Sequence, residues 1–387
     1  MNFLFKLFIK DYKNIENAEV RRKYGELGST TGIILNILLF IFKALAGVLT
    51  KSISIIADAF NNLSDAGSSI ITLIGFRLSD KPADNHHPFG HGRFEYISAL
   101  FVSVLILYMG LELGKSSFDK IINPEMTSFD ITSVVILISA ILVKGWMYLF
   151  NRKIGKTINS QPLIAGAKDS LCDSLATTVV LISVFISKIF DINIDGYAGL
   201  AISAFILYTG ATSIKDAISP LLGDTPDSEL VDDIADTVLS HKEITGIHDL
   251  IIHNYGPTRF MLSLHAEVPA NCNILSIHDT IDIIEKELSA KFGCDAVIHM
   301  DPVETDNETI NSAKEALNSI ITDISDELTM HDFRMVSGDT HTNLIFDVVV
   351  PFGFHINEKE LKELIQQKVF NYNTTYYVVI TIDKKFI

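Results

Sequence analysis

The first half of the chain consists of long apolar stretches separated by short polar connections. A helix needs about 20 predominantly apolar residues to cross the hydrocarbon layer of a bilayer. Six stretches reach that length, at roughly 28–50, 53–78, 94–116, 129–150, 161–187 and 195–213. The pattern predicts an all-α membrane domain of six transmembrane helices over residues 26–214.

After Pro220 the apolar positions recur in shorter segments, typical of a soluble fold. Helical periodicity alternates there with period-two stretches, and Gly256-Pro257 marks a turn between two of them. The predicted order is helix 228–240, strand 246–253, strand 258–268, helix 275–291 and strand 295–300. This αββαβ order predicts a two-layer α+β domain over residues 215–305.

The same order returns in the last 80 or so residues. His331-Asp332 matches His248-Asp249, "FDVVVP" (346–351) matches "LHAEVP" (264–269), and "VVITID" (378–383) matches "AVIHMD" (296–301). Asp347 then stands in place of His265, and Thr381 in place of His299. We interpret residues 306–387 as a second, degenerate copy of the α+β domain, with a weakened or lost metal site.

Charge divides the chain along the same boundary. From Ile214 to the C-terminus, 30 acidic residues face 12 basic ones, whereas the whole chain carries a net charge of −16. The first half is therefore nearly neutral, and the acidic half disfavours nucleic acid and attracts cations. Three cysteines without a CxxC pair indicate no disulfide framework.

Basic residues predict the orientation of the membrane domain. They gather in the N-terminal segment, in the connection between the second and third spans, and in the connection between the fourth and fifth. The positive-inside rule places these segments, and with six spans both chain termini, in the cytoplasm of a cell-membrane protein. Residues 1–25 are predicted to form one basic amphipathic helix on the inner membrane face.

The second and fifth spans carry polar side chains at mid-membrane. Asn61 and Asp65 are four residues apart, as are Asp169 and Asp173, so each pair lies on one helix face. Because ionisable groups are costly inside a bilayer, they normally face an interior site. We predict a divalent-metal site of four oxygen ligands; polar helix–helix contacts are the alternative. Such ligands suit Mn²⁺, Mg²⁺ or Ca²⁺ better than Zn²⁺.

Three further residues near these spans are interpreted more simply. Lys144 is expected to extend its ammonium group to the cytoplasmic interface from the end of the fourth span. Cys172 is expected to pack, and Asp58 could line an exit path.

Two histidine groups lie outside the spans. Asp84, His87 and His91, in the loop after the second span, have a spacing that could bind a metal; incidental loop histidines are the alternative. In the first α+β domain, His248, His265 and His299 lie at or near strands, and Asp301 shares a face with His299. A carboxylate bridging imidazole-bound cations is chemically reasonable, whereas ordinary surface histidines are the alternative.

Four motifs in order resemble the cation diffusion facilitator family of metal/proton antiporters, over residues 15–305. They are "SISIIADAFNNLSDAGSS" (52–69), "KPADNHHPFGHGRFE" (81–95), "AGAKDSLCDSLAT" (165–177) and "GIHDLIIHNYGPTRFMLSLHAEV" (246–268). The resemblance implies a homodimer with a ferredoxin-like cytosolic domain. It implies a transport site at Asn61, Asp65, Asp169 and Asp173, a loop site at Asp84, His87 and His91, and a cytosolic site at His248, His265, His278, His299 and Asp301.

Asn61 and Asp169 stand where zinc-transporting members have Asp or His and then His, which resembles the manganese branch. We therefore expect a secondary transporter, not an enzyme, that exports Mn²⁺ in exchange for H⁺ by alternating access. No prosthetic group is expected, and the partners are a second copy, the bilayer, divalent metal ions and protons. The alternatives are a Zn²⁺, Fe²⁺ or Co²⁺ exporter and a membrane-anchored metal sensor; an enzyme lacks a supporting motif.

Overall fold

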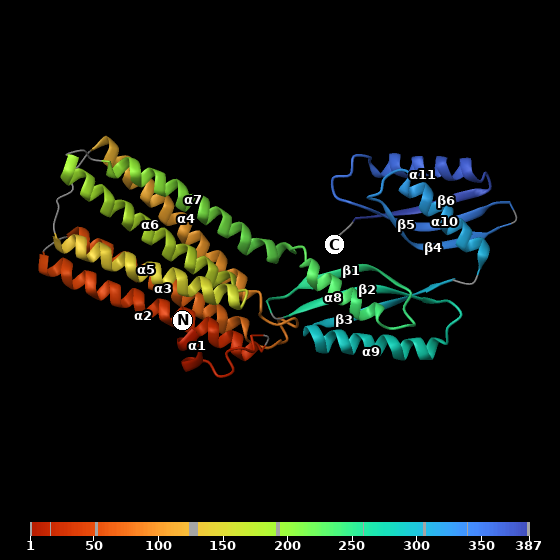
Figure 1. Ribbon diagram of the computed structural model, residues 1–387, viewed down its shortest axis with the longest axis horizontal. Coiled ribbons are helices and arrows are strands. Elements are labelled where there is room, and N and C mark those ends of the chain that lie inside the picture. Colours follow the sequence, from red (N-terminus) through yellow and green to blue (C-terminus); the bar gives the residue numbers. More distant parts are fainter. Residues whose placement is uncertain are drawn as a thin grey trace. The chain divides into compact units, whose positions relative to one another are not determined.

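A computed structural model describes residues 2–15, 17–50, 53–123, 131–190, 194–257, 259–304, 307–338 and 340–384. The chain divides into two compact units, labelled by element in Figure 1. The first comprises Met1–Asp224 with Asn254–Arg259, and the second comprises Thr225–His253 with Phe260–Ile387. The expected boundary between residues 305 and 306 lies outside the described residues.

The described elements between residues 2 and 224 of the first unit are all helices. Its elements are α1 (Asn2–Phe8), α2 (Ala18–Thr50), α3 (Ile53–Ser79), α4 (Phe94–Ile122), α5 (Ile131–Thr157), α6 (Gln161–Phe190) and α7 (Asp195–Leu222). Among the described residues, five helices are long and apolar enough to cross a membrane: α2, α4, α5, α6 and α7. Helix α3 is 27 residues long and packs against α2 and α4, but it is not among the five.

Small residues let the helices approach closely. A Cβ atom on Gly210 of α7 would lie 2.9 Å from the backbone nitrogen of Leu107 on α4, closer than such atoms can pack. A buried ion pair joins α2 to α4, because the Arg21 guanidinium donates two hydrogen bonds, of 2.8 and 2.9 Å, to Glu95. Both contacts fix the bundle that surrounds the polar site below.

The N-terminal segment differs from the prediction. A single helix over residues 1–25 is wrong, because α1 ends at Phe8 and α2 begins at Ala18. Between them Asp11 adopts a left-handed φ of 55°, and the Asn17 side chain accepts the backbone N–H of Glu19, which caps α2. The chain thus turns back, and Phe5 packs edge-on against Tyr24, with ring centroids 5.1 Å apart.

The second unit contains two lobes with the same element order. The first lobe is α8 (Ser228–Leu239), β1 (Gly246–Asn254), β2 (Phe260–Pro269), α9 (Ile274–Phe292) and β3 (Asp295–Val303). The second lobe is α10 (Glu308–Thr322), β4 (Thr329–Ser337), β5 (Thr342–Val350), α11 (Glu358–Tyr372) and β6 (Tyr376–Lys384). Each lobe has a three-stranded sheet, ordered β1-β2-β3 and β4-β5-β6, and the last two strands of each are parallel.

Strand alternation gives each sheet one apolar and one polar face. In β2 the side chains of Leu262, Leu264, Ala266 and Val268 are buried in the lobe's core. His265 and Glu267 therefore project from the opposite face, where they pair in register with His299 and Asp301 of β3. The second lobe has the same register, with Asp347 opposite Thr381 and Val349 opposite Asp383.

Candidate metal sites

A group of three carboxylates lies inside the helical unit. Asp65 comes from α3, and Asp169 and Asp173 come from successive turns of α6. One carboxylate oxygen of each lies within 4.8 Å of the other two, and both Asp65 and Asp169 are buried. We call these three residues the membrane triad. Oxygen atoms at this spacing from three acidic groups can jointly hold a divalent cation.

Lys144 takes part in the same site, contrary to the sequence-based interpretation. Its ammonium nitrogen lies 2.7 Å from the Asp65 carboxylate and 2.6 Å from the Asp173 carboxylate, and its side chain is only 4% exposed. The expectation that it reaches the membrane interface is wrong because α5 runs from Ile131 to Thr157, which puts Lys144 at its centre. At about 1.5 Å per residue, each end of α5 is about 20 Å away, beyond the reach of a lysine side chain.

The fourth predicted oxygen ligand is not where the sequence placed it. Asn61 has an exposed side chain, whereas the neighbouring Asn62 is buried. The Asn62 amide lies 3.5 Å from the Asp65 carboxylate, and its own carbonyl oxygen has no hydrogen-bond partner. Both residues lie one turn before Asp65, on either side of it, and α3 is rotated so that Asn62 points inward. The structure therefore brings Asn62, rather than Asn61, to the triad.

A polar cavity reaches the triad from one end of the bundle. It is lined by Asp169 together with small polar side chains from α2, α3 and α6, among them Ser29, Ser68, Thr72 and Ser170. Asn151 and Pro162, near the connection between α5 and α6, line it as well. That connection carries the basic residues that predicted a cytoplasmic position.

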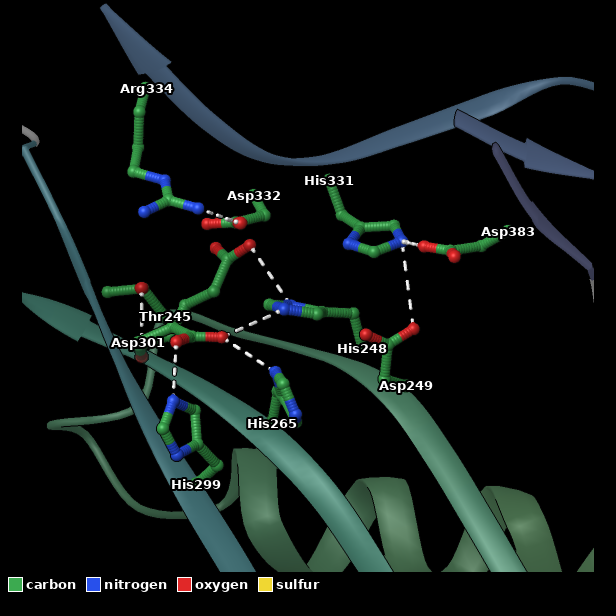
Figure 2. Close-up of polar contacts among 11 residues, drawn as sticks. Thr245, His248, Asp249, His265, His299, Asp301, His331, Asp332, Arg334 and Asp383 are labelled. Atoms are coloured by element: carbon green, nitrogen blue, oxygen red, sulfur yellow. Dashed lines mark hydrogen bonds and ion pairs between the residues drawn. The ribbon is translucent and has the colours of Figure 1, made fainter. Parts of the chain in front are cut away.

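The first lobe of the second unit holds a histidine cluster on the open face of its sheet. We use this name for His248 of β1, His265 of β2, and His299 and Asp301 of β3, which Figure 2 shows converging. The Asp301 carboxylate lies 3.0 Å from His248 Nε2, 2.9 Å from His265 Nδ1 and 3.2 Å from His299 Nε2. A single carboxylate thus contacts three imidazoles, an arrangement that suits a borderline metal.

The Glu267 carboxylate lies beside His248 of this cluster. Burial disfavours a charged His248 ring, but the nearby carboxylates of Glu267, Asp249 and Asp301 outweigh it and raise the His248 pKa. The nearby His248 ring in turn lowers the pKa of Glu267 below its ordinary value. The Glu267 carboxylate lies 3.6 Å from His248 Nδ1, so it acts on the ring through its charge rather than through a hydrogen bond.

His278 is not part of the cluster in the described structure. It lies on the exposed side of α9, the helix whose buried positions Ile277 and Ile281 cover the apolar face of the sheet. The cluster occupies the other face, so a helix residue of the same chain does not reach it. His253, for which the sequence suggested no role, is likewise exposed.

The loop between α3 and α4 brings its three predicted residues together. Asp84 lies 3.4 Å from both His87 and His91, whose ring centroids are 4.5 Å apart. Backbone N–H groups of His87 and His86 donate to Asp84 and lower its pKa. The other ring nitrogen of His91 lies 3.1 Å from the Pro82 carbonyl, an interaction that directs Nε2 toward Asp84.

Comparison with known proteins gives a consistent family assignment. Residues 29–222 match the cation efflux transmembrane domain, and residues 226–303 match the cytoplasmic domain of cation efflux proteins. The chain belongs to the cation diffusion facilitator family. An uncharacterized transporter from Methanocaldococcus jannaschii is 32% identical over 273 residues, which cover 70% of this chain and 96% of that protein.

Two further members of this family extend the comparison. The cation-efflux pump FieF of Cronobacter sakazakii is 30% identical over 287 residues, or 72% of this chain and 94% of the pump. FieF of Escherichia coli is 29% identical over 287 residues, or 73% of this chain and 95% of the pump. The chain is therefore a multi-pass membrane protein and a divalent-cation efflux transporter. Members of the family are secondary transporters rather than enzymes.

Proposed function

We propose that this family member exports Mn²⁺ from the cytosol in exchange for protons, by alternating access through the membrane triad. The observation that carries the proposal is the triad, in which Asp65 and Asp169 are buried and Lys144 lies between the Asp65 and Asp173 carboxylates. All ligand atoms offered by the triad are oxygen, which favours hard cations such as Mn²⁺. Lys144 offsets only one of the three carboxylate charges, so the site suits a transported metal ion.

The charge of the site supports exchange with protons. Three ionised carboxylates and the Lys144 ammonium sum to a net charge of about −2, which one divalent cation neutralises. Two protons carry the same charge, so they can replace the cation when the site faces the other side of the membrane. Lys144 would then hold Asp65 and Asp173 together while the cargo changes.

The polar cavity and the basic connections support entry from the cytosol. The cavity reaches Asp169 from the end of the bundle where α5 joins α6, and Arg152, Lys153 and Lys156 lie near that connection. By the positive-inside rule that end is cytoplasmic. With α3 counted as the sixth span, the N-terminus and both α+β lobes lie in the cytoplasm of a cell-membrane protein.

We further propose that the histidine cluster senses cytosolic metal in a homodimer. The matched cytoplasmic domain covers the first lobe, and the same order of elements in both lobes supports the interpretation of residues 306–387 as a second ferredoxin-like domain derived by duplication. Metal bound at the cluster would bias the transport equilibrium, because a ligand favours the conformation that it binds more tightly.

A Zn²⁺, Fe²⁺ or Co²⁺ exporter is the second candidate. The histidine cluster favours it, since three imidazoles and a carboxylate select borderline metals rather than Mn²⁺. A sensor that only anchors in the membrane has no use for the triad, which argues against that class.

Flux measurements in proteoliposomes test the proposal. The full-length chain is reconstituted, and uptake of Mn²⁺, Zn²⁺, Fe²⁺ and Co²⁺ is followed with and without an acidic lumen. We expect the highest rate for Mn²⁺, acceleration by the acidic lumen, and loss of that acceleration when an ionophore collapses the gradient.

Two variants complete this experiment. Asp169→Asn is expected to lower the initial rate by about 100-fold or more, because a ligand is lost. The matched control is Asp216→Asn, whose exposed carboxylate pairs with Lys168 outside the triad and whose loss leaves the rate unchanged. Full transport by Asp169→Asn would contradict the assignment of the triad as the transport site. A transport rate that does not depend on the pH gradient would contradict the exchange with protons.

A further inference from the structure

The second lobe keeps half of the positions that make the histidine cluster in the first lobe. His331 corresponds to His248, and Asp383 to Asp301, because both sheets pair their strands in the same register. Asp347 and Thr381 replace the other two members. His331 and Asp383 also lie beyond residue 303, where the match to the family's cytoplasmic domain ends.

A carboxylate of the first lobe completes this partial set, as Figure 2 shows. His331 Nε2 lies 3.4 Å from Asp383 and 3.7 Å from Asp249, and one ligand atom of each residue falls within 4.8 Å of the others. The His331 ring also stacks on His248, with ring centroids 4.6 Å apart. Residues from both lobes therefore converge on one point.

His331 is buried without a polar partner. Its side chain is 9% exposed, and neither of its ring nitrogens makes a hydrogen bond. Buried imidazole nitrogens are normally satisfied, so an unpaired ring aimed at two carboxylates needs an explanation. A bound metal ion supplies one.

The distances distinguish a metal site from a hydrogen-bonded pair. Separations of 3.4 and 3.7 Å are longer than ordinary hydrogen bonds. A tetrahedral metal with bonds of about 2.1 Å holds its ligand atoms about 3.4 Å apart.

The backbone explains how two adjacent residues serve two sites. Asp249 has a φ of 52° within β1, in the left-handed region that breaks strict strand alternation. His248 can therefore face Asp301 while Asp249 faces His331. Asp332 has the equivalent conformation in β4, with a φ of 49°, and pairs with Arg334 at 2.7 Å. Such conformations persist when the surrounding structure requires them.

We propose that Asp249, His331 and Asp383 form a metal site that joins the two lobes and is distinct from the histidine cluster. Two carboxylates neutralise one divalent first-row cation, the imidazole adds a nitrogen ligand, and water completes the coordination. The metal fixes the second lobe against the first within one chain. Metal binding thus holds the second lobe to the first. Asp347 and Thr381 replace two cluster histidines in the second lobe, but a metal site remains there.

Metal counting on the full-length chain in detergent tests this site. Zn²⁺ is the probe, measured by elemental analysis after gel filtration, for wild type, His331→Ala and Asp383→Asn. Each variant is expected to bind about one Zn²⁺ per chain fewer than wild type. The matched control is His355→Ala, an exposed histidine of the second lobe that should leave the count unchanged. An unchanged count in both site variants overturns the proposal.

A distance measurement tests the joining of the lobes independently of the count. Spin labels are placed at Lys286→Cys on α9 and Lys362→Cys on α11, in a chain that carries Cys172→Ser, Cys272→Ser and Cys294→Ser. Zn²⁺ is expected to narrow the distance distribution in this background but not when His331→Ala is added. A distance distribution that Zn²⁺ does not change overturns the proposal. Equal narrowing with and without His331→Ala also overturns it. Asp169 lies in the triad and outside both lobes, so Asp169→Asn leaves the Zn²⁺-dependent narrowing unchanged, and this test is independent of the transport proposal.

Discussion

The membrane triad and the histidine cluster differ in how the charges of their carboxylates are balanced. In the triad, two of the three carboxylates are buried, and an internal lysine lies between Asp65 and Asp173. In the cluster, one carboxylate serves three imidazoles that are neutral unless protonated, and the His299 side chain is 66% exposed. The proposed transport site thus carries an internal counter-ion, whereas the proposed sensing site has none among its four residues.

The largest effect expected from this comparison is at Lys144. Lys144→Met leaves Asp65 and Asp173 buried without a counter-ion, and removing one partner of a buried pair costs about 3–5 kcal/mol. Thermal unfolding without metal should show a clear fall in the midpoint temperature. Excess Mn²⁺ should recover most of it, because a bound cation replaces the ammonium charge.

Lys144→Arg is the control for that experiment, since it retains the positive charge. An unchanged midpoint in Lys144→Met would show that the ammonium does not stabilise the triad and would break the contrast between the two sites.

The next largest effect is at His265 in the cluster. His265→Ala should weaken Zn²⁺ binding at the cluster by about 10–100-fold, while the maximal Mn²⁺ flux at saturating metal stays within about twofold. Calorimetric titration of the full-length chain and proteoliposome flux measure the two quantities. His253→Ala, an exposed histidine of the same lobe, is the matched control. A flux loss as large as that of Asp169→Asn would mean that the cluster belongs to the transport path.

A smaller effect concerns pH in the absence of metal. Because the His248 pKa is raised above its ordinary 6.5, the charged ring stabilises the folded lobe at low pH, and this stability is lost as pH rises above about 6.5. The lowered Glu267 pKa adds stability above about 4.5 that is lost as pH falls. Stability of the metal-free chain, measured by denaturant unfolding, should therefore decline from pH 6 to 8.

Glu267→Gln should flatten this decline because it removes the partner of His248. Glu304→Gln, at an exposed position, should leave it intact. An identical decline in both variants would contradict the assigned role of Glu267.

The smallest effect is expected in the loop. His87 is half exposed and its ring lies 3.4 Å from Asp84, so His87→Ala removes one of three ligands from a solvent-accessible group. We expect a loss of loop metal binding with a change in flux of less than about twofold, because exposed charge pairs contribute little. His86→Ala is the adjacent control. A flux loss of tenfold would place the loop on the transport path.

Several features followed from the sequence because they depend on local pattern. Apolar runs identified the long helices, and period-two alternation identified the strands that carry His265 and His299. Spacing of four residues placed Asp169 and Asp173 on one face of α6. The strand register of the second lobe also followed from the repeat, because Asp347 pairs with Thr381 as His265 pairs with His299.

Other features were missed because they depend on how elements rotate and approach. Lys144 is a mid-helix lysine, and its position in an apolar helix was a usable signal once the helix ends were known. Asn61 and Asn62 are equally close to Asp65 in sequence, so only the rotation of α3 separates them. The chain reversal at Asp11 lies in a basic segment whose charge pattern resembles one helix.

The ligand types, the helices and strands that carry them, and the repeated order of elements could be predicted from the sequence, because these follow from residue chemistry and periodicity. Which side chains meet became visible only in the folded chain. Lys144 reaches Asp65 and Asp173 from a third helix, and Asp249 reaches His331 and Asp383 from another lobe. Contacts between distant segments depend on packing, and no local pattern encodes the rotation and approach that create them.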